Sequence, residues 1–254
     1  MATPSPFSLE GRTALVTGAN TGIGQGIAVA LAEAGAKVVA AGRSSMAETE
    51  KLIAEAGGTC FALQVDLQQL GIAARVIEQA AELAGPLDTL VNNAGIIRRA
   101  DALDFSESDW DEVMNLNLKA NFFLAQAFAK AALSAGRTGR IVNIASLLSF
   151  QGGIRVASYT ASKSGLAGLT RLLACEWAAR GINVNAIAPG YVESNNTEAL
   201  RADPDRNAAI LARIPAGRWG TPSDIGGAAV FLASGAAAYI HGAILPVDGG
   251  WLAR

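Results

Sequence analysis

The spacing between one tyrosine and one lysine is the feature of this sequence that most directly suggests chemistry. Tyr159 and Lys163 stand four residues apart in the run Ser158-Tyr-Thr-Ala-Ser-Lys163. If that run is helical, both side chains lie on one face and reach into the same space. A phenol with a pKa of about 10 exchanges protons poorly near neutral pH, whereas a nearby cation stabilises the phenolate. The pair indicates acid–base chemistry, unless both side chains simply lie on a solvated helix face.

A serine lies upstream of this pair, directly after an apolar segment. Residues 140–145 are apolar and β-branched in their middle and predict a buried strand, which places Ser146 at the strand's carboxyl end. In open parallel sheets, ligands bind just outside those ends. We therefore expect the Ser146 hydroxyl to hydrogen-bond a substrate oxygen.

Glycines cluster between a strand-like and a helical segment near the start of the chain. Gly18, Gly22 and Gly24 follow the apolar residues 14–16 and precede the helical pattern at 27–32. Such a turn lets backbone N–H groups and the helix N-terminus approach a pyrophosphate. The segment indicates a dinucleotide site, although a glycine cluster by itself is most often only a tight turn.

Length and composition indicate one folded domain with a sizeable core. The chain has 254 residues, 51% of them hydrophobic, and a formal net charge of only −2. This composition argues against disorder and against a polyanionic partner such as nucleic acid. We expect no metal site, because His241 is the only histidine and has no second ligand at metal-binding spacing.

No segment predicts export or membrane insertion. Residues 1–12 lack a signal-peptide pattern, and glycine, serine and histidine interrupt the longest apolar stretch, 225–244. Cys60 and Cys175 have apolar neighbours and no paired spacing, so we expect two buried free thiols in a reducing compartment. The sequence thus predicts a cytoplasmic protein.

Short apolar runs alternate with longer helical patterns along the whole chain. Strands are predicted at 13–17, 37–42, 59–65, 88–91, 139–144, 182–188 and 243–247, and helices near 22–34, 46–56, 69–84, 106–134, 157–180, 196–213 and 221–233. This alternation predicts an α/β fold with a Rossmann-type, doubly wound parallel sheet of about seven strands flanked by helices. We expect a single domain, 1–254, in which the polar stretch 191–218 forms a substrate lid.

These motifs, in this order, resemble the short-chain dehydrogenase/reductase family over nearly the whole chain. The resemblance is carried by the turn at 17–24, Asp66, the Asn-Asn-Ala-Gly run at 92–95, Asn117, Ser146, the Tyr159/Lys163 pair and Pro189-Gly190. It implies a catalytic tetrad of Asn117, Ser146, Tyr159 and Lys163. Tyr159 would exchange the proton and Ser146 would hold the substrate oxygen. Lys163 would bind the nicotinamide ribose and acidify the phenol, and Asn117 would hold a water of a proton relay.

The same resemblance implies that a nicotinamide dinucleotide lies across the carboxyl end of the sheet. Asp66 would contact the adenine ring, although it could instead only cap a helix. The full set that the resemblance places beside the cofactor is Gly18, Asn20, Thr21, Gly22, Ile23, Gly24, Asp66, Leu67, Asn93, Ala94, Gly95, Tyr159, Lys163, Pro189, Gly190, Val192 and Ser194.

The end of the second predicted strand bears on the choice between NAD and NADP. NAD-selecting domains often place a carboxylate there to bind the ribose 2′-OH. This chain has Gly42 in that place and Arg43 next to it. Because arginine suits a 2′-phosphate, we expect NADP(H) to be used at least as well as NAD(H), unless Arg43 only lies along the surface.

Further segments resemble one subgroup of the family, whose members interconvert a ketone and a secondary alcohol on deoxy sugar acids in uronate and pectin breakdown. These segments are 92–99, 105–110, 114–117, 149–155, 214–219 and 247–254. A sugar acid also fits the residues themselves, because arginines offer a carboxylate charge-assisted, bidentate donors. The candidate substrate-binding residues are Arg98, Arg99, Ser146, Gln151, Arg155, Tyr159 and Asn195.

Other interpretations of the function stay open. A related reductase could act on gluconate at another carbon or on a 3-oxoacyl carrier protein, whose acidity would require a basic docking patch. A dinucleotide-binding sensor is the non-enzymatic alternative, but it would not need the phenol of Tyr159. The apolar faces of the helices near 106–134 and 157–180, together with the resemblance, predict a homotetramer.

Overall fold

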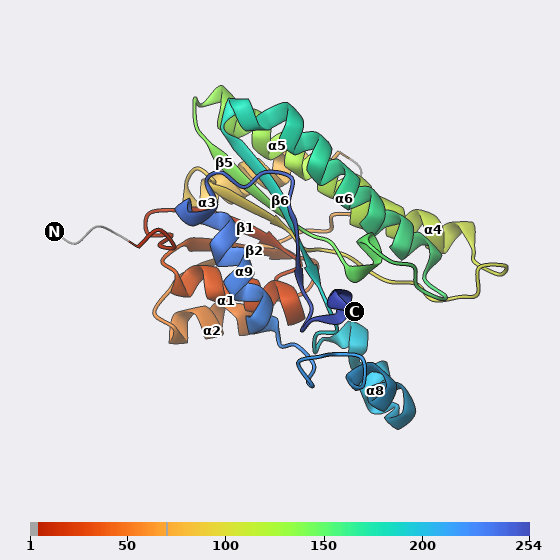
Figure 1. The fold of residues 1–254 in the computed structure, drawn as a ribbon. Coiled ribbons are helices and arrows are strands. Elements are labelled where there is room, and N and C mark those ends of the chain that lie inside the picture. Colours follow the sequence, from red (N-terminus) through yellow and green to blue (C-terminus); the bar gives the residue numbers. More distant parts are fainter. Residues whose placement is uncertain (1–4, 70) are drawn as a thin grey trace.

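A seven-stranded parallel sheet forms the centre of the protein (Figure 1). The computed structural model describes residues 5–69 and 71–254. The strands are β1 (Thr13–Thr17), β2 (Lys37–Gly42), β3 (Thr59–Gln64), β4 (Thr89–Asn92), β5 (Gly139–Ile144), β6 (Ile182–Pro189) and β7 (Ile244–Val247). They lie in the order β3-β2-β1-β4-β5-β6-β7, and every neighbouring pair is parallel. The chain therefore reverses direction across the sheet between β1 and β4, which opens a crevice at their carboxyl ends.

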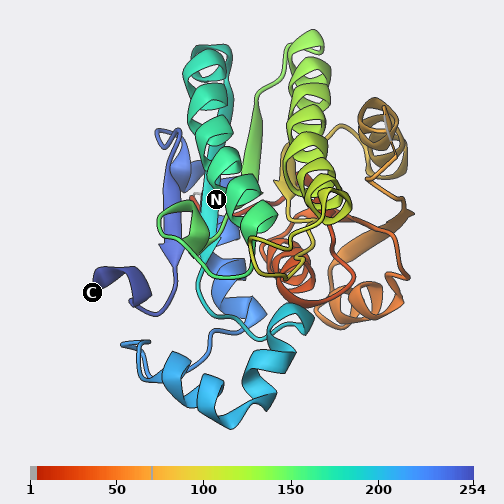
Figure 2. The same cartoon turned by 90° about the vertical axis from the view of Figure 1, so that its right-hand side faces the viewer.

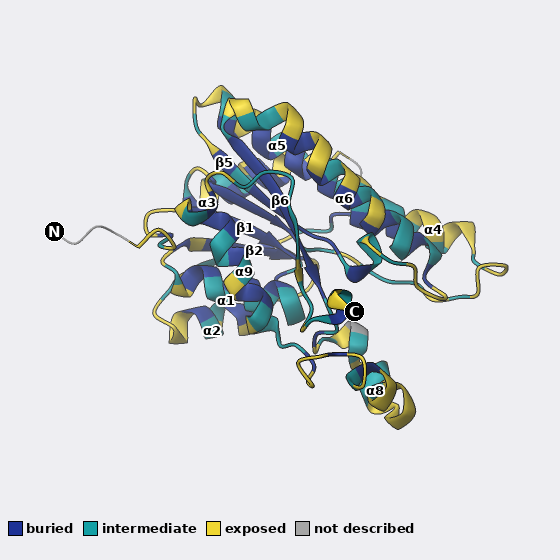
Figure 3. Ribbon diagram, viewed as in Figure 1, coloured by how far each residue is buried: buried dark blue, intermediate teal, exposed yellow. Residues whose placement is uncertain are grey.

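Helices cover both faces of the sheet (Figure 1). One layer contains α1 (Gly22–Glu33), α2 (Ala47–Glu55) and α9 (Pro222–Ala233), and the other contains α3 (Ala73–Ala84), α5 (Asn121–Ser134) and α6 (Ala157–Trp177). All five residues of β1 and all eight of β6 are buried, as two covered faces require. Figure 3 shows the strands as the most buried part of the protein.

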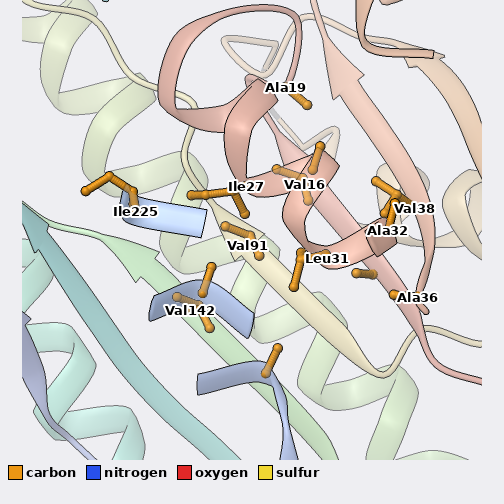
Figure 4. Packing of buried hydrophobic residues seen from close by; sticks show 14 of the residues in the cluster. Val16, Ala19, Ile27, Leu31, Ala32, Ala36, Val38, Val91, Val142 and Ile225 are labelled. Atoms are coloured by element: carbon orange, nitrogen blue, oxygen red, sulfur yellow. The ribbon is translucent and has the colours of Figure 1, made fainter. Parts of the chain in front are cut away.

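The core under α1 and α9 explains how the first β–α unit is held in place. Ile27 and Leu31 of α1 are fully buried and lie beside Val16 and Val91 of the sheet, and Ile225 of α9 closes the cluster (Figure 4). Apolar residues at this helical spacing form one continuous stripe toward the sheet. The stripe fixes the position of α1, whose first turn follows the glycine-rich segment.

The predicted strands agree with the structure to within one residue at each end, but three of the predicted helices are subdivided. The segment 106–134 contains α4 (Glu107–Met114), a π-helical turn η1 (Asn115–Ala120) and α5. The segment 157–180 continues past α6 as a 3-10 turn, η3 (Ala178–Arg180). The segment 196–213 contains η4 (Asn195–Thr197), α7 (Glu198–Ala202) and α8 (Pro204–Leu211). Pro204 has no N–H to continue α7, and the Asp203 side chain caps α8 instead.

Two further predictions differ from the structure: the start of one helix and the burial of the two cysteines. The helix predicted from residue 69 begins at Ala73, and residue 70 lies outside the described residues. The prediction that both cysteines are buried is wrong. Cys60 lies half-buried on the edge strand β3, and Cys175 is exposed on α6 because it faces away from the sheet.

The helices α7 and α8 lie away from both layers, beyond the carboxyl ends of the strands (Figure 2). They belong to the stretch 191–218, which leaves the sheet after β6. None of the helices in the described part of the chain has the length and apolar character needed to span a membrane.

Replacing Gly226 by alanine should lower the free energy of unfolding by about 1–3 kcal/mol, because the core there has no room for a methyl group. A Cβ at Gly226 would lie 2.6 Å from the Cβ of Ala30 on α1. The matched control is Gly227→Ala in the same helix, where a Cβ would meet nothing within 4 Å. That variant should gain up to about 1 kcal/mol from helix propensity. Urea denaturation measures both, and equal effects would contradict the packing of α1 on α9.

Candidate active site

A cleft of about 340 Å³ opens at the carboxyl edge of the sheet, where the direction of the chain reverses. Residues from the ends of β1, β4, β5 and β6 line it, together with the first turns of α1 and α6. Ser146, Tyr159 and Lys163 all lie in this cleft. The structure thus brings together three residues of the predicted tetrad that the sequence separates.

Ser146 is held in place by the turn that follows β5. It is the N-cap of a short 3-10 turn, η2 (Leu147–Ser149), and its Oγ accepts a hydrogen bond from Leu148 N at 3.2 Å. The hydroxyl also hydrogen-bonds Tyr159, and this bond favours the phenolate. The serine and the phenol can therefore contact one shared substrate oxygen.

Lys163 lies deeper than Tyr159, one helical turn further along α6. Its side chain is only 4% exposed, and Nζ donates a hydrogen bond to the carbonyl of Ile144 at 2.6 Å. The ammonium group lies 5.6 Å from the centre of the Tyr159 ring. Because burial disfavours the charged form, it lowers the pKa of Lys163 to about 8.

The phenol of Tyr159 experiences opposing effects. Burial, the largest of them, raises its pKa, while the hydrogen bond from Ser146 and the positive charge of Arg99 lower it. The sequence predicts that Lys163 acidifies this phenol. The structure does not bear this out, because the pKa of Tyr159 is raised overall and the groups that favour the phenolate are Ser146 and Arg99.

Asn117 lies at the centre of the π-helical turn η1 and is fully buried. Its amide forms a two-bond clamp on Ile96, with Oδ1 accepting from Ile96 N at 2.9 Å and Nδ2 donating to Ile96 O at 2.8 Å. Its own carbonyl accepts from Asn121 Nδ2 at 2.8 Å. The asparagine thereby joins the helix to the loop after β4, while its side chain does not line the cleft.

The glycine-rich turn forms a cradle suited to a pyrophosphate. Gly18 has a left-handed φ of 64°, and a Cβ at Gly24 would overlap the carbonyl oxygen of Gly18. The side chain of Thr21, the N-cap of α1, makes no capping hydrogen bond. The first amide N–H groups of α1 therefore remain available to an anion. The cradle fits the phosphates of a dinucleotide.

A cross-link between β1 and β4 holds this cradle against the loop after β4. Asn93 Nδ2 donates to Thr17 O and Gly18 O at 2.9 and 3.1 Å. In return, Thr17 Oγ1 accepts from the backbone N–H groups of Asn93 and Ala94, each at 3.0 Å. Asn93 satisfies backbone groups and also lines the cleft, as the sequence analysis allowed.

A second hollow of about 160 Å³ continues the cleft toward the ends of β2 and β3. Arg43 lines it and is exposed, and a Cβ at Gly42 would lie 2.7 Å from Met46 Cε. A carboxylate at position 42 would therefore require Met46 to move. Asp66 Oδ1 accepts from Gln68 N at 3.0 Å, so Asp66 supports its own turn and lines the hollow as well.

Every residue assigned to the cofactor from the sequence lines one of these two hollows. Those in the cleft are Gly18, Asn20, Thr21, Gly22, Ile23, Gly24, Asn93, Ala94, Gly95, Tyr159, Lys163, Pro189, Gly190, Val192 and Ser194, and those in the second hollow include Arg43, Asp66 and Leu67. In the described ranges, no group of three or more His, Cys, Asp or Glu residues could hold a metal ion.

The candidate substrate residues divide into two groups. Ser146, Tyr159 and Asn195 line the cleft, whereas the other four, Arg98, Arg99, Gln151 and Arg155, are not among its lining residues. Arg98 does not line it, because Nε and Nη2 each donate to the Glu112 carboxylate on α4 at 2.9 Å. Its neighbour Arg99 is the arginine whose charge acts on Tyr159.

Arg155 occupies a strained position on the loop between Ser146 and Tyr159. It is the only non-glycine residue in the described part of the chain with a positive φ, 62°. Its Nε lies 3.3 Å from Asp101 Oδ1, and its carbonyl accepts from Ala100 N at 3.2 Å. Backbone strain of this kind often marks a functional loop. The Gln151 side chain, on the same loop, accepts a hydrogen bond from Trp251 Nε1 at 3.3 Å.

The sequence analysis missed three residues that line the cleft, Ile144, Ala145 and Thr197. Ile144 contributes a carbonyl, for which side-chain patterns carry no signal. Thr197 could have been found, because it stands three residues after Ser194 and completes a capping box with it.

Comparisons with known proteins agree with this geometry. A family model described as enoyl-(acyl carrier protein) reductase matches residues 18–252. The chain is 56% identical over 250 residues to the 2-dehydro-3-deoxy-D-gluconate 5-dehydrogenase of Escherichia coli (strain K12), which covers 98% of this chain and 99% of that relative.

Solved structures resemble the fold closely. A structure from Agrobacterium tumefaciens, provisionally assigned as a 2-deoxy-D-gluconate 3-dehydrogenase with bound NADP, has a TM-score of 0.95 at 68% identity and covers 99% of this chain and 100% of its own. A gluconate 5-dehydrogenase from Burkholderia cenocepacia J2315, in complex with NADP and tartrate, has a TM-score of 0.92 at 37% identity and covers 98% of each chain.

Replacing Lys163 by methionine should raise the free energy of unfolding at pH 7 by on the order of 2 kcal/mol, because the variant no longer buries an ammonium group. The gain should shrink as the pH rises from about 8 to 10.5, the window between the folded and ordinary pKa values of Lys163. Across this window the unfolded lysine keeps a proton that the folded one has lost, so wild-type stability rises with pH relative to the variant.

Urea denaturation of both proteins at pH 7 and pH 10 measures this difference. A gain that stays constant between the two pH values would show that Lys163 does not titrate with a lowered pKa.

Proposed function

Since the chain belongs to the short-chain dehydrogenase/reductase family, we propose that it interconverts a ketone and a secondary alcohol on a deoxy sugar acid, as a 2-dehydro-3-deoxy-D-gluconate 5-dehydrogenase does. The observation that carries this proposal is the grouping of Ser146 and Tyr159 in the cleft, with the charge of Arg99 acting on the phenol. A hydroxyl pair suits the reacting oxygen, and an arginine nearby suits the carboxylate of the substrate. Three relatives with this name are 54–56% identical to the chain over 98% of its length, which supports the proposal.

The proposed mechanism uses the tetrad predicted from the sequence. A bound nicotinamide supplies or accepts the hydride. In ketone reduction, Tyr159 donates a proton to the substrate oxygen while Ser146 stabilises the charge that develops there. In alcohol oxidation, the phenolate accepts the proton. Lys163 would hold the nicotinamide ribose, and Asn117 keeps η1 and the loop at Ile96 in place.

We propose NADP(H) as the preferred cofactor. Arg43 lines the second hollow, where it can pair with a 2′-phosphate, and Gly42 provides no carboxylate of the kind typical of NAD selection. The similar structures from Agrobacterium tumefaciens and Burkholderia cenocepacia were both solved with NADP.

For the substrate, we propose that Arg99 binds the carboxylate and that Arg155, Gln151 and Asn195 contact further oxygens of the substrate. The bound tartrate in the gluconate 5-dehydrogenase relative is itself a hydroxy acid. Arg98 is left out of this set, because Glu112 and Asp109 already neutralise its charge. This pairing also removes part of the basic patch that an acyl carrier protein would need, so we rank the 3-oxoacyl reductase lower than a gluconate-type dehydrogenase.

We also propose that the chain is one domain that assembles as a cytoplasmic homotetramer, with residues 191–218 as the lid. A largely apolar hollow of about 840 Å³ lies between α3 and α5. Phe123 on α5 and Leu172 on α6 are 43% and 47% exposed on the outer surface of these helices. A second copy that packs on α5 and α6 would bury these side chains.

Tyr159→Phe should lower kcat for reduction of a 2-keto-3-deoxy acid with NADPH by at least about 100-fold, because the proton donor is lost. NADPH affinity, followed by fluorescence titration, should change by less than about two-fold, since the aromatic ring remains. Oxidation of NADPH at neutral pH gives the turnover. Wild-type protein without turnover on this substrate class would overturn the proposed function, and an active phenylalanine variant would overturn the role of Tyr159.

Adjacent arginines allow a matched test of carboxylate binding. Arg99→Ala should raise KM for the keto acid by about ten-fold or more, because a charge-assisted hydrogen bond is lost. Arg98→Ala should leave KM within about two-fold of the wild type, since that guanidinium binds Glu112. Initial-rate kinetics at saturating NADPH measure both, and the reverse order of effects would contradict the assignment.

A further inference from the structure

The carboxyl-terminal residues fold back onto the proposed lid and form a small core of their own. Leu147, Ile210, Ile214, Trp219 and Trp251 are all buried together, and we name this group the tail–lid cluster. It joins three separate segments: the loop after β5, the lid region and the end of the chain. Leu147 directly follows Ser146, so the cluster adjoins the proposed catalytic residues.

A tight turn after β7 directs Trp251 into this cluster. The Asp248 carboxylate accepts hydrogen bonds from Gly250 N at 2.8 Å and from Leu252 N at 2.9 Å. Gly249 and Gly250 have left-handed φ values of 64° and 89°, which other residues adopt only with strain. The turn therefore fixes the orientation of the indole ring before any ligand binds.

Trp251 makes one hydrogen bond, one contact with an aromatic ring and one with a guanidinium group. Its ring centre lies 4.7 Å from that of Tyr191, and the guanidinium of Arg213 lies 3.9 Å from the indole. The only hydrogen bond of the indole nitrogen among the described residues runs from Nε1 to Gln151 Oε1 at 3.3 Å. Trp251 is 4% exposed, so the loss of this bond would leave a buried donor without a partner.

This single bond determines which atom of the Gln151 amide points toward Trp251 and which points away from it. An indole N–H can only donate, so the atom that it contacts must be the carbonyl oxygen of the glutamine. The amide NH₂ group of Gln151 is then turned away from Trp251, and it has no hydrogen-bond partner among the described residues. Gln151 lies on the loop that joins Ser146 to Tyr159. Gln151 therefore presents a donor, and not an acceptor, on the side that faces away from Trp251.

We propose that Trp251 is a positioning residue for substrate selection: it holds Gln151 so that the amide NH₂ donates to an acceptor oxygen of the substrate, a carboxylate or a second carbonyl. This inference rests on the proposed function. It also assigns a role to the end of the chain, which contacts the substrate only through Gln151. A neutral hydroxyl could accept the same bond, but an anionic or carbonyl oxygen gains more from a fixed donor.

A purely structural role for Trp251 is the competing explanation. The indole fills the tail–lid cluster, so its loss could loosen the lid and weaken substrate binding without any involvement of Gln151. A double-mutant cycle separates the two explanations, because coupling between Trp251 and Gln151 appears only if they act through their shared bond.

The variants for this cycle are Trp251→Phe, Gln151→Ala and the double variant. Phenylalanine keeps most of the ring volume and the contact with Arg213 but removes the N–H. We expect KM for a 2-keto-3-deoxy acid to rise about three- to ten-fold in Trp251→Phe, and to rise no further when the change is made in the Gln151→Ala background. The affinity for NADPH should stay at the wild-type value in all three variants.

Trp219 provides the matched control within the same cluster. Its indole N–H donates to Asn207 Oδ1 at 2.7 Å, inside the lid region, and does not contact Gln151. Trp219→Phe removes the same number of atoms and one hydrogen bond. Its effect on KM should therefore be independent of Gln151→Ala, so the two fold-changes should multiply.

Gln151→Glu tests the direction of the bond. A glutamate can still accept from Trp251 but offers the substrate a negative oxygen in place of a donor. KM should therefore rise further in Gln151→Glu than in Gln151→Ala at a pH where the glutamate is ionised.

The possible outcomes separate this inference from the proposed function. If the wild type does not turn over any keto-deoxy acid, the proposed function fails first. If it does, but the effects of Trp251→Phe and Gln151→Ala multiply as for Trp219, Trp251 only packs the lid. If Gln151→Glu binds the substrate as well as the wild type, Gln151 does not act as a donor. Either of the last two results would overturn the inference.

Discussion

The hydrogen bond between Lys163 Nζ and the carbonyl of Ile144 is the interaction on which the site depends. A buried ammonium group is costly, and this is its only hydrogen bond in the described part of the chain, so helix α6 must lie where the end of β5 can accept it. The residue two positions after Ile144 is Ser146. One bond thus sets the distance between the strand end that presents the serine and the helix that presents the phenol.

Backbone groups at the carboxyl edge of the sheet perform most of the remaining positioning. Thr17 and Asn93 tie the ends of β1 and β4 together through four hydrogen bonds, and Asn117 clamps the next segment at Ile96. These polar side chains are expensive to bury unless they are satisfied, so each also specifies one geometry of the loops. The cleft is consequently formed by the fold itself.

Arg98 and Arg99 illustrate how neighbouring residues of one type acquire different roles. The first lies against α4, where Glu112 and Asp109 neutralise it, and the second acts on the charge of Tyr159. A run of two arginines in a sequence suggests a basic patch of two charges. In the structure the two side chains act at different places, Arg98 on the carboxylates of α4 and Arg99 on the phenol, and do not form one such patch.

The sequence by itself determined the strands and the glycine-rich turn, because apolar runs and glycine spacing are local signals. The tetrad came from the family resemblance and stays a prediction: Ser146, Tyr159 and Lys163 meet in the cleft, whereas Asn117 does not line it. The sequence did not predict that the helix expected at 196–213 divides at Pro204, that Cys175 is exposed, or that Arg98 and Arg99 contact different groups. It also could not show the bond from Trp251 to Gln151, which joins residues 100 positions apart. Such features depend on which helix faces and loops meet after the sheet has formed, and contacts over that sequence separation leave no periodic pattern in the chain. Only the tertiary structure decided them.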